Sequence, residues 1–300
     1  MLRYALRQLQ SELSIHRTAR TESLDNQGLA TRFDPGGAPV GREEQPLPPT
    51  YGAGMRIRGV IFDLGSTLIY RTGLELEKDK CSALAAFAGA DLGCGDPQQV
   101  AAHLLEIRLD GWRRSGEEQV EYPATRSIAQ AFRAAGLPTD DQTLRQAEAV
   151  FFEPEVRVSR LYPGAQEALE ALRSLGLRLG MISNATSHEL ILGITMKHKI
   201  DAYFSPLVSS AGFGRVKPHP SIFAHVLDIW GLPAGSVVMI GDTLGADILG
   251  ARQVGMRSVL VDIEPNPANP EFAGAVTPGA RVTSLVEVPP LMRDWAAEEG

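Results

Sequence analysis

The sequence predicts an α/β protein with a Rossmann-like core, in which a parallel sheet lies between two layers of helices, and with an all-helical domain inserted into that core. Short apolar runs alternate with helical patterns from Met55 almost to the end of the chain. This alternation is typical of a parallel sheet covered on both faces. Residues 73–158 interrupt the alternation, and residues 1–54 differ in composition from everything that follows.

The predicted strands are apolar runs that are too short for helices and are bounded by turn residues. They comprise residues 60–62, 177–182, 207–210, 237–240, 257–261 and 280–283. Apolar residues at helical spacing predict core helices over 165–175, 220–230, 245–254 and 288–295. Gly176 directly follows the first of these helices, a common position for the glycine that ends a helix. We therefore expect a catalytic core made of residues 55–72 and 159–300.

Residues 73–158 are rich in Ala, Leu, Arg and Glu and contain no convincing buried strand. Their spacing predicts helices over 75–89, 97–113, 124–136 and 140–152. Ligands of open α/β sheets bind at the carboxyl edge of the strands. A helical insert between the first and second strands is therefore predicted to form a cap over that edge.

Residues 1–54 have the composition of a flexible extension. Residues 35–54 contain five prolines and five glycines, which is typical of a linker. Before them, leucines at helical spacing lie near several arginines, over residues 2–20. This pattern fits an amphipathic targeting or docking helix, and it also fits an untethered tail or an upstream extension of the reading frame. Both interpretations stay open.

The composition limits the classes of partner. A net charge of −7 argues against nucleic acid or an anionic membrane as the main partner. Two cysteines are too few for a disulfide framework, and no apolar run approaches the ~20 residues that span a bilayer. We expect a cytoplasmic protein, monomeric or homodimeric, that acts on a small molecule.

Polar residues follow the predicted strands in four segments. These residues are Asp63 with Gly65 and Thr67, then Ser183 with Asn184, then Lys217, and finally Asp242 with Asp247. Adjacent parallel strands bring their carboxyl ends together, so the three aspartates are expected to converge near the lysine. Like charges at such distances are costly without a cation, and oxygen ligands of this kind suit Mg²⁺. The serine hydroxyl and the asparagine amide suit phosphate oxygens.

Each segment alone also has an ordinary structural explanation. Asp63 could belong to a turn, Asp247 could favour a helix N-terminus, and Ser183-Asn184 could cap a helix. Lys217 before a proline could be solvated surface. Their order and their shared position at strand ends favour a catalytic site.

With these motifs, the sequence resembles the haloacid dehalogenase superfamily, in the branch with a C1-type helical cap, from about Met55 to Trp295. Asp63 and Thr67 match the nucleophile and the threonine of the first family motif, and Ser183 and Lys217 match the second and third motifs. Asp242 and Asp247 match the acidic pair of the fourth. The stretch from Gly241 to Met256 is especially specific.

The resemblance implies a Mg²⁺-dependent hydrolase, most simply a phosphatase that forms an aspartyl-phosphate on Asp63. Mg²⁺ would be held by Asp63, the backbone carbonyl of Gly65 and Asp242, with Asp247 adjacent. Lys217 and Ser183 would stabilise the phosphate oxygens, with Thr67 and Asn184 beside them.

The sequence departs from the family pattern at Gly65, where the family usually has a second aspartate that protonates the leaving group. General acid catalysis typically contributes ~10²–10⁴-fold, so its loss should matter most for poor leaving groups. The gap leaves three alternatives to a phosphatase: a dehalogenase, a phosphonatase-type hydrolase that uses a cap lysine, and a weakly active protein that binds a phosphorylated ligand. Lys78 and Lys80 are the only lysines in the predicted cap and are poorly placed for the second.

The substrate is expected to be chosen by the cap. Arg71 and the cluster Trp112-Arg113-Arg114 could contact an anionic leaving group. The cluster also fits a solvated helix face with one packed ring. The sequence does not identify the substrate.

Overall fold

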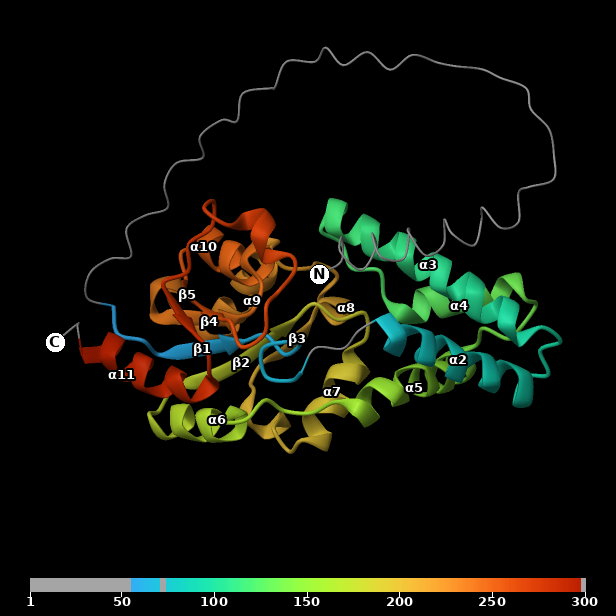
Figure 1. The fold of residues 1–300 in the computed structure, drawn as a ribbon, viewed down its shortest axis with the longest axis horizontal. Helices are drawn as coiled ribbons and strands as arrows, with labels where there is room; N and C mark the ends of the chain where they lie inside the picture. The colour runs from blue at the N-terminus through green and yellow to red at the C-terminus, as the bar shows by residue number, and fades with distance from the viewer. Residues whose placement is uncertain (1–54, 71–73, 298–300) are drawn as a thin grey trace, which may run out of the picture.

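The computed structural model describes residues 55–70 and 74–297 (Figure 1). The core is a six-stranded, wholly parallel sheet in the order β3-β2-β1-β4-β5-β6. The strands are β1 (Gly59–Phe62), β2 (Arg178–Ser183), β3 (Leu207–Ser209), β4 (Val237–Gly241), β5 (Arg257–Val261) and β6 (Ala280–Val282). The predicted Rossmann-like α/β fold is confirmed. The predictions for residues 1–54 and for Arg71 lie outside the described residues.

Strand β1 lies at the centre of the sheet and all four of its residues are buried. Successive side chains of a strand point to opposite faces, so Ile61 packs in one core cluster while Val60 and Phe62 pack in the other. Such burial on both faces explains the continuous apolar run. In the register, Phe62 aligns with Met181 of β2 and Ile240 of β4, so these three strands end at the same level.

Helices cover both faces of the sheet (Figure 1). Helices α9 (Pro220–Trp230) and α10 (Leu249–Gln253) lie on one face, and α6 (Ala165–Ser174), α7 (His188–Lys197) and α11 (Val288–Ala297) lie on the other. Each helix buries its apolar side against the strands. The three layers leave only the edges of the sheet open to a ligand.

The segment 74–158, here called the helical insert, contains α2 (Leu74–Ala90), α3 (Pro97–Glu118), α4 (Ala124–Ala134) and α5 (Asp141–Val158). Buried side chains of the four helices include Leu84, Leu104, Ile128 and Phe151. In Figure 1 these helices lie beyond the carboxyl ends of the strands. No helix of the described part of the chain is long and apolar enough to cross a membrane.

Several elements differ from the prediction. Helix α3 extends five residues further, and α5 continues to Val158 through Pro154, although proline usually ends a helix. Strand β3 is one residue shorter, because the Ser209 side chain caps the short helix α8 (Ser210–Phe213). Helix α7 was not predicted; its N-cap Ser187 accepts a hydrogen bond from Leu190 N.

The helix predicted over 245–254 is two elements. A π-helical turn (Leu244–Ile248) precedes α10. The wider turn places Asp247 at the sheet edge, and π-bulges are often found at functional sites. An uninterrupted α-helix was the wrong prediction at a position that carries one of the candidate site residues.

Candidate active site

Asp63 lies directly after β1, at the carboxyl edge of the sheet. Its backbone N donates to Ile240 O at 2.9 Å, which fastens it to the neighbouring strand β4. One carboxylate oxygen, Oδ2, accepts a hydrogen bond from Thr67 Oγ1 at 3.1 Å, and Oδ1 lies 2.7 Å from Lys217 Nζ. The residue is only 7% exposed. A buried carboxylate fixed on both oxygens is well oriented for chemistry.

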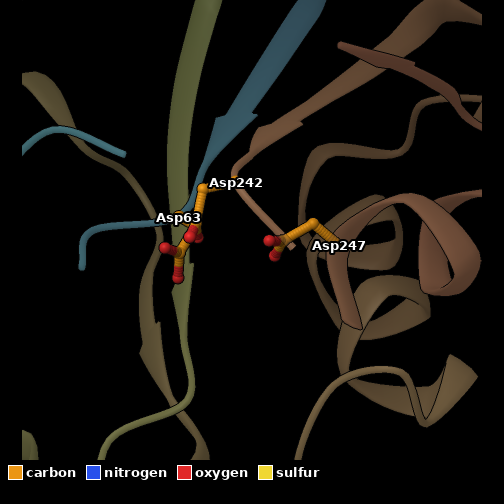
Figure 2. A group of neighbouring side chains, drawn as sticks. All are labelled: Asp63, Asp242 and Asp247. Atoms are coloured by element: carbon orange, nitrogen blue, oxygen red, sulfur yellow. The ribbon is translucent and has the colours of Figure 1, made fainter. Parts of the chain in front are cut away.

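Asp242 and Asp247 join Asp63 from the end of β4, and Figure 2 shows the three carboxylates turned toward one another. One oxygen from each lies within 4.8 Å of the other two, and all three residues are buried. A Cβ atom at Gly241 would lie 2.3 Å from Cγ of Asp247. Glycine at that position is therefore what lets the Asp247 carboxylate approach the strand.

Lys217 is the cation at the centre of this group. Its buried Nζ donates to Asp63 Oδ1 and Asp247 Oδ1, both at 2.7 Å, and to the backbone oxygen of Ile182 at 2.8 Å. Burial alone would lower the pKa of Lys217, but the charges of Asp247 and Asp63 outweigh burial and raise it. Lys217 is therefore charged at neutral pH.

Asn184 positions the lysine rather than presenting a free amide. Its Nδ2 donates to Lys217 O at 3.0 Å, and its Oδ1 accepts from Lys217 N at 2.8 Å. The reciprocal pair ties the segment after β2 to the segment that carries the lysine. A contact from Asn184 to substrate, expected from the sequence, stays a prediction.

Ser183 is the last residue of β2 and is buried, next to Ser209 of β3 in the sheet register. Within the described part of the chain its hydroxyl has no hydrogen-bond partner. This leaves it available to a phosphate oxygen, which is the contact that the sequence predicts.

The residues present fit a divalent cation. Three buried carboxylates face a single ammonium, which leaves an excess of negative charge that is costly in a buried site. Burial raises the pKa of Asp247 to about 6; the charge of Lys217 opposes this and the charge of Asp63 adds to it. The donor set is wholly oxygen, which suits Mg²⁺ better than zinc. The backbone carbonyl of Gly65 as a further ligand stays a prediction.

Two site residues were missed by the sequence analysis. Asn266 donates to Asp242 Oδ2 at 2.6 Å, and Asn269 donates to Asp242 O at 2.9 Å while accepting from Leu244 N at 2.7 Å. Both lie in the loop after β5, the strand next to β4. The signal that could have found them is polar residues between prolines just after a predicted neighbouring strand.

Gly65 and Ser66 are the two positions at which the first motif departs from the family pattern. Ser66 replaces the usual glycine and has φ 61°, in the left-handed region that favours glycine. A Cβ atom at Gly65 would meet no heavy atom within 4 Å. The position therefore has room for a Cβ atom, although the sequence supplies none.

The cationic side chains of the helical insert are largely neutralised. Lys80 is buried between Glu77 at 2.7 Å and Glu155 at 2.8 Å, and Arg108 is buried against Glu77. Lys80 also lies over an aromatic ring, that of Phe151. A lysine held in this way is a poor candidate to form a Schiff base with a substrate. This argues, as the position of Lys80 in the sequence does, against a phosphonatase that uses a cap lysine.

The cluster at 112–114 is a solvated helix face. Arg113 pairs with Asp110 and Glu117, and Arg114 pairs with Glu118, all with exposed side chains. The ring of Trp112 lies against the guanidinium of Arg108. The second of the two interpretations of this cluster is therefore the one that the contacts support.

A family model described as haloacid dehalogenase-like hydrolase matches residues 57–255, which is well over half of the chain. The chain belongs to the haloacid dehalogenase-like hydrolase family. The family is one of hydrolases, and the matched region runs from Ile57, just before β1, to Gly255, just after α10. It includes all of the residues that form the carboxylate cluster and Lys217.

Curated relatives of this family member include named phosphatases. The chain is 34% identical over 130 residues to a glyceraldehyde 3-phosphate phosphatase of Pyrococcus abyssi, covering 42% of this chain and 53% of that protein. It is 34% identical over 158 residues to a phosphoserine phosphatase of Thermus thermophilus, covering 52% and 59%. The match thus spans between half and three fifths of these relatives' length.

Longer and more distant matches also exist. An N-acylneuraminate-9-phosphatase of Rattus norvegicus is 27% identical over 261 residues, covering 79% of this chain and 94% of that protein. Among solved structures, a 2-haloacid dehalogenase from Pseudomonas syringae has a TM-score of 0.61 at 23% identity, covering 80% of this chain and all of that one. A haloacid dehalogenase-type phosphatase from Thermococcus onnurineus has a TM-score of 0.54 at 20% identity, covering 79% and 98%. The structural likeness shows the family fold.

Proposed function

We propose that this hydrolase is a Mg²⁺-dependent phosphatase that acts on a small phosphorylated metabolite through an aspartyl-phosphate on Asp63. One observation carries the proposal: the buried carboxylates of Asp63, Asp242 and Asp247 lie close together, and Lys217 pairs with two of them. A dehalogenase that works without a metal ion has no need for three carboxylates around a single lysine. The names of the phosphatase relatives support the same reaction class.

In the proposed reaction the Asp63 carboxylate attacks phosphorus and the bond to the leaving oxygen breaks. Water then hydrolyses the acyl phosphate, releasing inorganic phosphate and restoring the carboxylate. Lys217 and the Ser183 hydroxyl stabilise the charge on the phosphoryl oxygens. This stabilisation is strongest when the donors are fixed before the reaction. Thr67 holds the nucleophile in place.

Mg²⁺ would be held by Asp63 and Asp242 and the carbonyl of Gly65, with Asp247 beside it, and would supply positive charge between the nucleophile and the phosphoryl group. Asn266 and Asn269 orient Asp242, because hydrogen bonds to ligating carboxylates fix their geometry.

We also propose that residues 73–158 act as a cap and that the core comprises 55–72 and 159–300, after a flexible extension at 1–54. The position of the helical insert beyond the carboxyl edge supports the cap (Figure 1). A cytoplasmic location is supported by two free cysteines, Cys81 and Cys94. The net charge of −7 argues against nucleic acid or an anionic membrane as the main partner. We propose a small phosphorylated substrate and a monomer or homodimer.

The proposed function is tested with purified protein and an activated aryl phosphate. We expect turnover in the presence of Mg²⁺ and its loss in EDTA, because the carboxylates repel an anionic substrate when no cation lies between them. Release of halide from a 2-haloacid at equal rates with Mg²⁺ and EDTA would establish the dehalogenase instead. Phosphate-ligand binding without turnover of any phosphoester would establish the binding protein.

The missing general acid leads to a prediction about leaving groups. Gly65→Asp should raise the rate on alkyl phosphates relative to aryl phosphates by about 10²-fold, because an alkoxide must be protonated as it leaves and a phenolate need not be. A Cβ atom at residue 65 would meet no heavy atom within 4 Å, so the substitution starts without a steric clash. The measurement is kcat/KM on a matched alkyl and aryl phosphate pair.

The matched control for this prediction is Gly65→Asn, which has nearly the same size and cannot donate an acidic proton. The alkyl-to-aryl ratio should stay at the wild-type value in this variant. An unchanged ratio in Gly65→Asp as well would mean that another group already supplies the proton.

A further inference from the structure

The loop between α3 and α4 (residues 119–123) connects the helical insert to the core through backbone hydrogen bonds. Glu121 N donates to Gly214 O at 3.1 Å, and Val216 N donates to Gln119 O at 3.4 Å. An antiparallel bridge joins the same two segments between these bonds. The loop therefore pairs with the residues that immediately precede the site lysine.

The Glu121 side chain anchors the same loop to a second segment of the core. The residue is 8% exposed, and its carboxylate accepts hydrogen bonds from Tyr122 N, at 2.8 Å, and from Ser210 Oγ. Ser210 Oγ accepts in turn from Ala185 N at 2.9 Å and lies 3.2 Å from Ala185 O. Ala185 directly follows Asn184, so this second connection ends at the segment after β2.

The two connections converge on one pair of residues. The first ends one residue before Lys217, and the second ends one residue after Asn184. Lys217 and Asn184 are hydrogen-bonded to each other through both polar atoms of the asparagine side chain. Hydrogen bonds and single peptide links therefore connect the loop continuously to Lys217 and to Ser183.

We propose that Glu121 is a positioning residue: through Ser210 it holds the loop of the helical insert against the two segments that carry Ser183 and Lys217, and so keeps the phosphate-stabilising groups in place. The inference rests on the proposed phosphatase function for its kinetic consequence. Its structural consequence can be measured without any turnover.

A carboxylate at this position costs stability, which argues that it serves the site. Burial raises the pKa of Glu121, while the hydrogen bonds from Ser210 and Tyr122 and the charge of Arg108 act in the opposite direction. An apolar side chain would remove the desolvation cost, whereas it could not bind the Ser210 hydroxyl. Of its two hydrogen bonds, the one from Tyr122 N stays within the loop and the one from Ser210 reaches the core.

The test uses the full chain and three variants. Glu121→Ala removes the contact with Ser210. Glu121→Gln keeps a polar group of the same length, since the amide oxygen can accept a hydrogen bond from the serine hydroxyl as the carboxylate does. Glu117→Ala removes the same charge from an exposed carboxylate four residues earlier, paired only with Arg113 in the described structure, and serves as the matched control.

The first readout is amide hydrogen exchange. In Glu121→Ala we expect the amides of residues 185 and 216–217 to exchange about tenfold faster, the effect of losing one hydrogen bond's stabilisation. Glu121→Gln and Glu117→Ala should keep wild-type exchange there. Unchanged exchange at these amides in Glu121→Ala would overturn the inference, whether or not the protein proves to be a phosphatase.

The second readout is steady-state hydrolysis of an aryl phosphate with Mg²⁺. Glu121→Ala should lower kcat by about 10- to 100-fold with less than a threefold change in KM, because misplaced catalytic groups lose rate more than binding. Glu121→Gln should recover most of the rate. A rise in KM at constant kcat would overturn the inference, because it would mean that Glu121 only docks the insert.

The Ser210→Ala variant tests the path of the coupling. If Glu121 acts through Ser210, the double variant Glu121→Ala/Ser210→Ala should be no slower than Ser210→Ala alone. Multiplicative losses would show that the two residues act independently and would overturn the proposed route. The wild-type protein could lack phosphatase activity while Glu121→Ala still shows faster amide exchange. That result would refute the proposed function and leave the positioning role established.

Discussion

Asp63→Asn is expected to abolish phosphate hydrolysis, with a loss on the order of 10⁴- to 10⁶-fold in kcat, as is found when a covalent nucleophile is removed. The amide keeps the shape of the carboxylate and can still accept a hydrogen bond from Thr67 or Lys217. It cannot attack phosphorus. The variant should therefore fold normally and fail only in chemistry, which an initial-rate assay and a thermal melt measure together.

The matched control is Asp262→Asn. Asp262 follows β5 as Asp63 follows β1, but it is paired with Arg281 and partly exposed. Its replacement should leave kcat within about twofold of wild type, since most surface changes have small effects. Retention of turnover in Asp63→Asn would mean that the nucleophile is another group, and the proposed mechanism would be wrong.

Lys217→Met is expected to destabilise the metal-free protein by about 3–5 kcal/mol, the usual cost of removing one partner of a buried ion pair. Asp63 and Asp247 would be left buried without their cation, next to Asp242. Methionine has nearly the length of lysine, so the loss reports the charge rather than a cavity. Urea denaturation in EDTA measures the change in the free energy of unfolding.

The loss should be smaller in Mg²⁺, because a bound cation compensates part of the missing positive charge. Removing a carboxylate should act in the same direction: Asp63→Asn in the Lys217→Met background should be more stable than Lys217→Met alone. Lys78→Met is the control, since Lys78 lies on the surface beside Glu75 and an exposed pair contributes about 0–1 kcal/mol. Equal destabilisation by the two lysine variants would contradict the electrostatic account of the site.

Lys217→Met should also reduce kcat, by about 10²- to 10³-fold, as when one preorganised donor to a transition-state oxyanion is lost. The effect on KM should be smaller. The two measurements separate the contributions of the lysine to folding and to chemistry.

The fold and the centre of the site could be predicted because they depend on simple periodic patterns. Apolar runs place the parallel strands, and polar residues at their carboxyl ends must meet at one edge. The convergence of Asp63 and Asp242 follows from this rule, whereas Asp247 and Lys217 also depend on the turns that follow their strands. The structure agrees with it to within hydrogen-bond distances.

The residues that could not be predicted are those whose partners are set by loop conformation. Asn266 and Asn269 lie in a proline-rich loop without periodicity, and only its folded path brings them to Asp242. Glu121 lies 89 residues before Ser210 in the sequence, so nothing local indicates the contact. The same limitation concealed the π-helical turn at Asp247, because one extra residue in a turn leaves the apolar spacing nearly unchanged.

The open space at residue 65 has a consequence for engineering. No heavy atom lies within 4 Å of a Cβ atom built at that position. The first atom of a side chain can therefore be added next to the nucleophile without a steric clash with the surrounding protein.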